Sequence, residues 1–218
     1  MIRTKASDGR APSDREHHRS ALLNTVNFAK RRTFVVHKHW IGVWVAAALV
    51  LSACAGPWKT APDKLSAPQW SIASPAGWMH LRTQESEMLS KDGAYLEYIL
   101  VQARPLDQHF RFTHHKLNAG MLPHEAAQLI TDNMRSDPLI RQFRLLSSEP
   151  AILDGQEGFR LIYTYRDQNG VVLKTIYYGA VLPDQFFNLR YTAAQRYYFD
   201  QELPVFNRTV QSLRLASQ

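Results

Sequence analysis

The side chains that could bind a metal ion are concentrated in one short segment of the chain. The segment between residues 107 and 124 holds one aspartate and four histidines: Asp107, His109, His114, His115 and His124. On a strand, the adjacent His114 and His115 would point to opposite faces. The segment also lacks the HExxH and H-x-x-x-H spacings of helical zinc sites. We therefore expect a polar loop ahead of a helix here, with no metal and no cofactor.

The sequence gives little support for nucleophilic catalysis. The sequence contains neither G-x-S-x-G nor S-x-x-K, and Ser147-Ser148 has no partner in a known signature. Catalytic triads assemble in space, so a missing motif makes an enzyme less favoured without excluding one. We predict a protein that is not an enzyme, and a hydrolase or a metal-dependent enzyme remains the alternative.

The single cysteine, Cys54, follows a short apolar segment. Residues 40–53 carry no charge and come soon after the basic run Lys30-Arg31-Arg32. As a helix, this segment would be roughly 21 Å long, whereas the hydrocarbon core of a bilayer is about 30 Å thick. A basic region, a short apolar region and small residues before a cleavage point are typical of a secretory signal. Positive charge ahead of the apolar run keeps that end cytoplasmic while the following chain is exported.

The four residues Leu51-Ser52-Ala53-Cys54 resemble the bacterial lipobox at every position. The resemblance implies that a signal peptidase recognises Leu51, Ser52 and Ala53, and that a diacylglyceryl group is joined to Cys54. Two or three acyl chains hold a protein stably at a membrane. Ala55, rather than aspartate, implies the periplasmic face of the outer membrane if the source is Gram-negative. The alternative is a small buried cysteine at the end of a core helix.

Charge and composition divide the chain into three parts. Most of the net charge of +7 falls before residue 40, and the remainder is nearly neutral, so we expect no nucleic-acid partner. Residues 1–53 are predicted to be an N-terminal extension and a lipoprotein signal peptide, and whether residues 1–29 are translated stays open. Residues 54–68 contain three prolines and are predicted to be a lipid-anchored linker. Residues 69–218 are predicted to be one folded domain.

The pattern of apolar and turn residues in this domain predicts an α+β fold with an antiparallel sheet of about six strands flanked by helices. Short strands are expected at 70–72, 79–83, 87–90 and 94–103, and three long strands at 158–193. Residues 171–182 are apolar on both faces and should form a central strand. A two-residue Asn169-Gly170 turn would pair Tyr163 with Ile176, and a four-residue loop would shift that register.

Two helices should pack on this sheet. The first begins at Pro123, carries its apolar residues at i+4 steps and ends at Asp137-Pro138. The second has apolar residues at steps of four and three between Phe199 and Leu213. Pro204 lies inside it and implies either a kink or a second segment.

The order of these elements, with Pro75-Ala76-Gly77-Trp78 after the first strand and Val205 to Arg214 in the last helix, resembles the PsbP-like superfamily. The resemblance covers residues 69–215. It implies an α/β/α sandwich and a binding or assembly accessory rather than an enzyme. None of that family's functional residues can be matched here.

Aromatic residues are concentrated in the last third of the chain, on both faces of several predicted strands. Some tyrosine hydroxyls should therefore reach solvent, and tyrosine and arginine are favoured at protein interfaces. We predict a partner surface that involves Arg160, Arg166, Arg190 and Tyr191. The resulting prediction is a lipid-anchored envelope lipoprotein that binds or helps assemble an envelope protein. The alternatives are a lipid-tethered enzyme and a structural subunit of an envelope or secretion machine.

Overall fold

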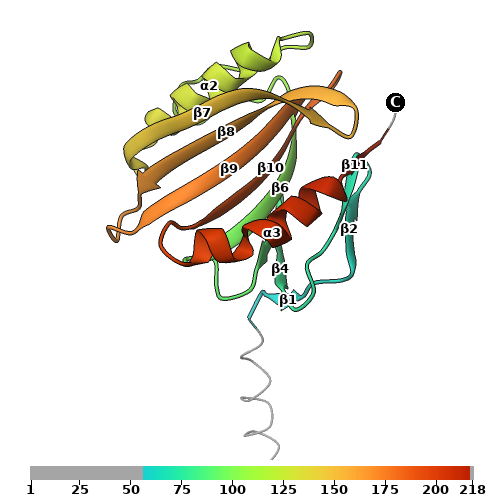
Figure 1. Cartoon of the computed structure of the whole chain (residues 1–218). Coiled ribbons are helices and arrows are strands. Elements are labelled where there is room, and N and C mark those ends of the chain that lie inside the picture. Colours follow the sequence, from blue (N-terminus) through green and yellow to red (C-terminus); the bar gives the residue numbers. More distant parts are fainter. Residues whose placement is uncertain (1–55, 217–218) are drawn as a thin grey trace, which may run out of the picture. The chain divides into compact units, whose positions relative to one another are not determined.

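The computed structural model describes residues 56–216 (Figure 1). The predicted signal peptide, the lipobox-like residues 51–53 and Cys54 lie outside the described residues. The predictions made for them therefore stay predictions.

The described part of the chain contains two helices and eleven strands. The helices are α2 (Pro123–Arg135) and α3 (Tyr198–Gln211). The strands up to α2 are β1 (Lys59–Thr60), β2 (Lys64–Ala67), β3 (Trp70–Ala73), β4 (Met79–Arg82), β5 (Glu87–Ser90) and β6 (Glu97–Pro105). The later strands are β7 (Arg141–Leu153), β8 (Gln156–Arg166), β9 (Val172–Val181), β10 (Gln185–Ala194) and β11 (Arg214–Leu215).

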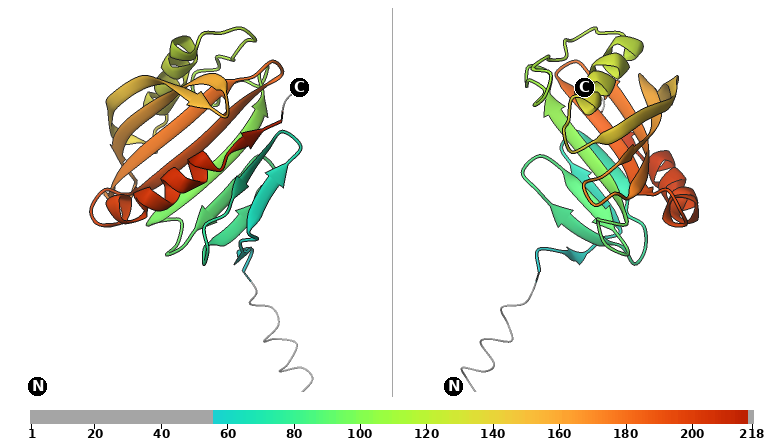
Figure 2. Two further views of the ribbon diagram at one scale, coloured as in Figure 1. Left: turned by 45° about the vertical axis from the view of Figure 1, so that its right-hand side comes forward. Right: turned by 90° about the vertical axis from the view of Figure 1, so that its left-hand side faces the viewer.

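Eight strands form one antiparallel sheet in the order β1-β4-β5-β6-β10-β9-β8-β7, and a smaller sheet has the order β11-β3-β2. The helices α2 and α3 lie on opposite sides of the large sheet (Figure 2). The predicted α+β class is confirmed, although the large sheet has more than six strands. The edge strand β7 was not predicted, because most of its side chains are exposed and it contains Pro150. The sequence of β7 therefore lacks the apolar alternation of a half-buried strand.

The first predicted helix is confirmed as α2. Pro123 occupies the first turn, and the Glu125 carboxylate accepts a hydrogen bond from the Leu122 amide at 3.0 Å. The buried residues Ala126 and Ile130 pack against Phe159 and other residues of the sheet. An i+4 apolar stripe thus covers one sheet face, which we call the α2 face.

The opposite face, which we call the α3 face, packs against α3 and the small sheet. Phe199 and Phe206 of α3 are buried against Tyr191 of β10, and Trp70 of β3 contacts Phe187. The helix passes through Pro204 without a break, so the terminal stripe is one helix and not two segments.

The linker predicted at residues 54–68 is wrong for residues 59–67. Strand β2 pairs with β3 along its whole length, and the Leu65 side chain is 3% exposed in the core. Strand β1 pairs with β4 at the edge of the large sheet. Strands β1 and β2 have two and four residues and lie between prolines. Strands this short show no period of apolar residues, so the sequence of the segment predicted a linker.

The meander at residues 158–193 is confirmed, with β9 in the interior of the sheet, but both predicted registers are wrong. Tyr163 pairs with Thr175, one residue away from the predicted Ile176. Gly170 has a φ of 84°, whereas Asn169 does not have a positive φ, and the Gly170 amide donates to the Asp167 carbonyl at 3.2 Å. This is a three-residue loop with a type I turn and a left-handed glycine, whereas a type I′ turn needs positive φ at both central residues.

Candidate functional site

The central strand β10 carries apolar side chains on one face and polar side chains on the other. Leu189 and Tyr191 belong to the apolar core of the α3 face. Because side chains alternate along a strand, Asn188, Arg190 and Thr192 point to the α2 face. Of these three polar side chains, two have partners within the sheet. The Asn188 amide donates to the Gln102 side-chain oxygen at 3.2 Å, and the Thr192 hydroxyl lies 2.9 Å from that of Thr175.

Arg190 is the third polar side chain, and it has no hydrogen-bond or ion-pair partner among the described residues. Its Nε is fully buried. Arg104 and Arg160 also have a buried Nε without a partner, but both bind an acceptor through a terminal nitrogen. Arg104 donates to the Gln108 carbonyl at 2.5 Å and Arg160 to the Glu149 carboxylate at 3.1 Å. Arg190 is therefore a partly buried cation that has neither a hydrogen-bond acceptor nor an ion-pair partner among the described residues.

The groups that act electrostatically on Arg190 are four tyrosines: Tyr98, Tyr163, Tyr165 and Tyr177. They come from three strands, β6, β8 and β9, which lie beside or near β10 in the sheet. The largest electrostatic effects on the guanidinium thus come from phenols and not from an aspartate or a glutamate. The sheet therefore surrounds a positive charge with phenol rings and hydroxyls.

Burial favours the protonated form of three of these tyrosines, Tyr163, Tyr165 and Tyr177. It raises the pKa of Tyr163 to about 12, although the positive charge of Arg190 acts to lower it. Burial also raises the pKa of Tyr165 and of Tyr177. The hydroxyls therefore stay protonated at neutral pH. Burial acts to lower the pKa of Arg190 and the four tyrosines to raise it, with a net upward shift, so the guanidinium stays positive.

Arg190 lines a cavity of about 480 Å³, which we call the Arg190 cavity. Its wall comes from β6, β8, β9, β10, the end of α2 and the loops that follow β5, β6, α2 and β8. The apolar side of the wall includes Phe112, Met134, Leu139, Ile140 and Leu173. Tyr95, which is 85% exposed, and Leu139, which is 51% exposed, make the surface around the cavity partly apolar.

Two aspartates, Asp137 and Asp167, also line the Arg190 cavity. Asp137 accepts a hydrogen bond from the Leu139 amide at 2.9 Å, and Asp167 accepts one from the Val171 amide at 2.7 Å. Both carboxylates thus hold turns of the backbone, and neither one pairs with Arg190.

The four residues of the predicted partner surface do not form one surface. Tyr191 has no exposed area, and its hydroxyl donates to the carbonyls of Tyr198 and Phe199 at 2.9 and 3.2 Å. Arg160 and Arg166 lie on the other side of the sheet from Arg190, because β8 presents its odd-numbered residues to the α2 face. Arg166 donates to the carbonyl of Gly170. Including Tyr191 was wrong, because a tyrosine of a central strand can satisfy its hydroxyl without reaching solvent.

The tyrosines around Arg190 were not predicted as a group. The useful signal lies in β10, where polar Asn188, Arg190 and Thr192 alternate with apolar residues in a strand that should be buried. An arginine on the inner face of a central strand needs a partner or a ligand.

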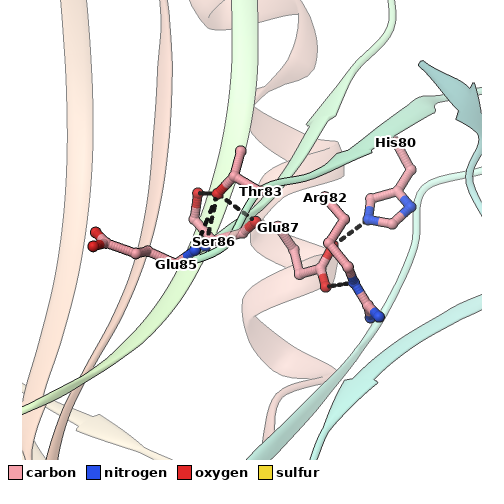
Figure 3. Close-up of polar contacts among 6 residues, drawn as sticks. All are labelled: His80, Arg82, Thr83, Glu85, Ser86 and Glu87. Carbon is pink, nitrogen blue, oxygen red and sulfur yellow. Dashed lines mark hydrogen bonds and ion pairs between the residues drawn. The ribbon is translucent and has the colours of Figure 1, made fainter. Parts of the chain in front are cut away.

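A second polar cluster lies on the β4–β5 hairpin (Figure 3). Glu87, which is 7% exposed, receives His80 on one carboxylate oxygen and Arg82 on the other. At the turn, the hydroxyls of Thr83 and Ser86 lie 2.9 Å apart and bond to each other. The hairpin therefore does not join a hydroxyl to the histidine, as nucleophilic catalysis would require.

Of the four histidines in the histidine-rich segment, His109, His114 and His115 lie in the loop between β6 and α2, and His124 lies in the first turn of α2. His109, His114, His115 and His124 are all exposed. Within residues 56–216, no group of three histidine, cysteine or acidic side chains is placed to hold a metal ion. The helices of this same part of the chain are too short or too polar to cross a membrane.

Comparison with known proteins found no matching family model and no matching curated protein. Among solved structures, the chain is similar to the cyanobacterial PsbP protein CyanoP from Synechocystis, with 14% identity over 75% of this chain and 96% of that one and a TM-score of 0.49. It is also similar to the Saccharomyces cerevisiae Ran-binding protein Mog1p, with 9% identity over 72% of this chain and 96% of that one and a TM-score of 0.47.

A third similar structure is LpqN of Mycobacterium tuberculosis, which is involved in cell envelope biogenesis. It has 12% identity over 75% of this chain and 88% of that one, with a TM-score of 0.39. At these identities and TM-scores, we transfer no function or partner from the three proteins to this chain.

Proposed function

We propose that this chain is a cell-envelope lipoprotein whose folded domain acts by binding an envelope protein rather than by catalysis. The anchoring part of the proposal is supported by Leu51-Ser52-Ala53-Cys54, which resemble a lipobox directly after a short apolar segment. In a Gram-negative cell, Ala55 favours the periplasmic face of the outer membrane.

The binding part of the proposal is carried by one observation, which is the Arg190 cavity. Its wall contains a cation without a protein partner, and exposed apolar side chains surround it. Buried polar groups in proteins are normally paired, and concave apolar sites with a few polar groups are typical of ligand binding. Tyr95 and Leu139 offer a partner the kind of exposed apolar area that protein interfaces bury.

The anchor is tested by the substitution Cys54→Ser in cells that are given labelled palmitate. We expect the label to disappear and the protein to leave the membrane fraction, because serine offers no sulfur for the thioether. Ser52→Ala is the control, because it keeps a small residue before the cleavage point, and it should be labelled as the unsubstituted protein is. Unchanged labelling of Cys54→Ser would refute the anchor.

The binding role is tested by affinity capture from solubilised membranes with the full-length chain. Leu139→Ser removes an exposed apolar residue at the cavity, and Leu146→Ser removes one of similar exposure, 55%, on β7. We expect one specific envelope protein, whose recovery falls about tenfold with Leu139→Ser and stays unchanged with Leu146→Ser. No specific protein, or equal recovery with both variants, would contradict the proposal.

A further inference from the structure

The Arg190 guanidinium is costly to the folded protein as it stands. A buried donor without a partner loses its hydrogen bonds to water and gains nothing in return, and this loss of free energy is larger for charged groups than for neutral ones. The structure leaves Nε of Arg190 in this state and brings no carboxylate to the guanidinium. A ligand that carries a negative charge would remove this cost.

We infer that the Arg190 cavity binds a small amphiphilic carboxylate, whose head group pairs with Arg190 and whose apolar part lies against the α2 side of the wall. This inference goes beyond the proposed function: it concerns the inside of the Arg190 cavity, whereas the proposed protein partner contacts the exposed Tyr95 and Leu139 around it.

The charge of the ligand follows from the groups that face Arg190. Tyr163 and Tyr165 of β8 line the cavity together with Arg190, and burial keeps both phenols protonated at neutral pH, so their hydroxyls can donate. Hydroxyl donors beside a cation form an environment that stabilises an anion. A cationic head group placed beside Arg190 would instead be repelled by the guanidinium.

The wall also discriminates between a carboxylate and a phosphate. Among the described residues that line the cavity, Arg190 is the one cationic side chain, whereas Asp137 and Asp167 are acidic. A dianion would meet one positive charge and two negative charges, so a monoanion fits better. The planar guanidinium matches a carboxylate with two parallel hydrogen bonds.

The remainder of the ligand follows from the size and the apolar part of the cavity. Cavities of about 300–1,000 Å³ hold small molecules, and this one has about 480 Å³. Phe112, Met134 and Ile140 offer aromatic and aliphatic contacts. A carboxylate with an apolar chain or ring of moderate length therefore uses both sides of the wall.

The test compares three probes of the same shape by calorimetric titration of the purified full-length chain at constant ionic strength. The probes are 4-phenylbutyrate, 4-phenylbutanol and 4-phenylbutylamine. We expect the carboxylate to bind at least about tenfold more tightly than the alcohol, since a charge-assisted hydrogen bond contributes about 1.5–3 kcal/mol. The amine should bind most weakly. Equal affinities, or no binding of 4-phenylbutyrate, would overturn the inference.

Substitutions test whether the three probes bind in the Arg190 cavity. Arg190→Met should remove the preference for the carboxylate over the alcohol, and Arg160→Met, on the opposite side of the sheet, should keep it. Met134→Trp should weaken all three probes, because it fills the cavity from α2 while leaving the charge in place. A carboxylate preference that survives both Arg190→Met and Met134→Trp would refute the site.

The failure of this inference can be told apart from that of the proposed function. The titration uses purified protein without a partner, and the capture experiment uses no added carboxylate. If 4-phenylbutyrate does not bind while Leu139→Ser still loses the captured protein, the ligand chemistry is wrong and the binding role stands. If the probes behave as expected and no protein is captured, the envelope-protein partner is wrong.

Discussion

The two faces of the large sheet are built from neighbouring residues of the same strands, but Tyr191 and Arg190 of β10 differ in how their polar groups are paired. On the α3 face, Tyr191 is fully buried and its hydroxyl has two carbonyl acceptors, while the buried Glu202 pairs with Lys91 at 2.8 Å. On the α2 face, Arg190 has no partner and lines a cavity. One residue step along β10 therefore separates a tyrosine with two acceptors from an arginine without one.

This difference indicates a division of roles within one sheet. The α3 face contributes to the free energy of unfolding, because its apolar area is buried and most of its polar groups are paired, with the Oε2 atom of Glu97 as an exception. An open face with an unpaired cation loses stability, as binding sites often do. If this division holds, substitutions on the α3 face should change stability, and those at Arg190 should change binding.

The largest expected effect is that of Phe206→Ala on the α3 face. The Phe206 ring has no exposed area and lies 5.4 Å from the Tyr191 ring. We expect a loss of about 3–5 kcal/mol in the free energy of unfolding, measured with urea. Phe112→Ala in the cavity wall, where the side chain is partly exposed, should cost about 1–2 kcal/mol. Equal losses would show that the two faces are equally closed.

Gly179→Ala tests how tightly the α2 face is packed away from the cavity. A Cβ at this position would lie 2.5 Å from the Phe159 ring and 2.9 Å from the Phe186 ring, both buried. We expect a destabilisation of about 1–3 kcal/mol in urea unfolding. Gly56→Ala, which meets no atom within 4 Å, is the control. If Gly179→Ala is as mild as the control, the α2 face is loose throughout and not only at Arg190.

Arg190→Met should stabilise the protein by about 1 kcal/mol, because it replaces an unpaired buried donor with an apolar chain of similar length. The measurement is the urea midpoint without added ligand. Arg160→Met removes an exposed ion pair with Glu149 and should change stability by less than about 0.5 kcal/mol. A marked loss of stability in Arg190→Met would mean that the guanidinium is structural.

The variant Glu97→Gln tests the comparison of the two faces through the pH dependence of the free energy of unfolding. Burial of Glu97 raises the pKa of its carboxyl above the usual value, although the amides of Lys91 and Asp92 and the Ser90 hydroxyl act to lower it. A raised folded-state pKa contributes stability below the unfolded pKa, and this contribution is lost as pH rises through the folded value.

The difference in unfolding free energy between the Gln variant and the unsubstituted protein should therefore shift in favour of the variant between acid and neutral pH. Urea unfolding at several pH values measures it. The glutamine oxygen can still accept from the amides that bind Glu97 at 2.8 Å. A difference that does not depend on pH would mean that Glu97 titrates alike in the folded and unfolded chain.

Particular elements show how far the sequence alone could predict this fold. The helix α2 was predicted from Pro123 and an i+4 stripe, both of which are local features. The β8–β9 register was not predicted, because it depended on whether Asn169 would take a positive φ. Strand β2 was taken for linker because its one deeply buried residue, Leu65, forms no pattern by itself.

The sequence by itself determined the type of most elements, the α+β class and the prediction of a lipid-bearing Cys54, because each depends on residues that are close together in the chain. Only the tertiary structure decided the environment of Arg190. Its four tyrosine neighbours come from β6, β8 and β9, and strand order and pairing register bring them together. Whether an arginine on a strand is a surface residue or an unpaired cation in a cavity depends on these long-range neighbours, and local periodicity carries no information about them.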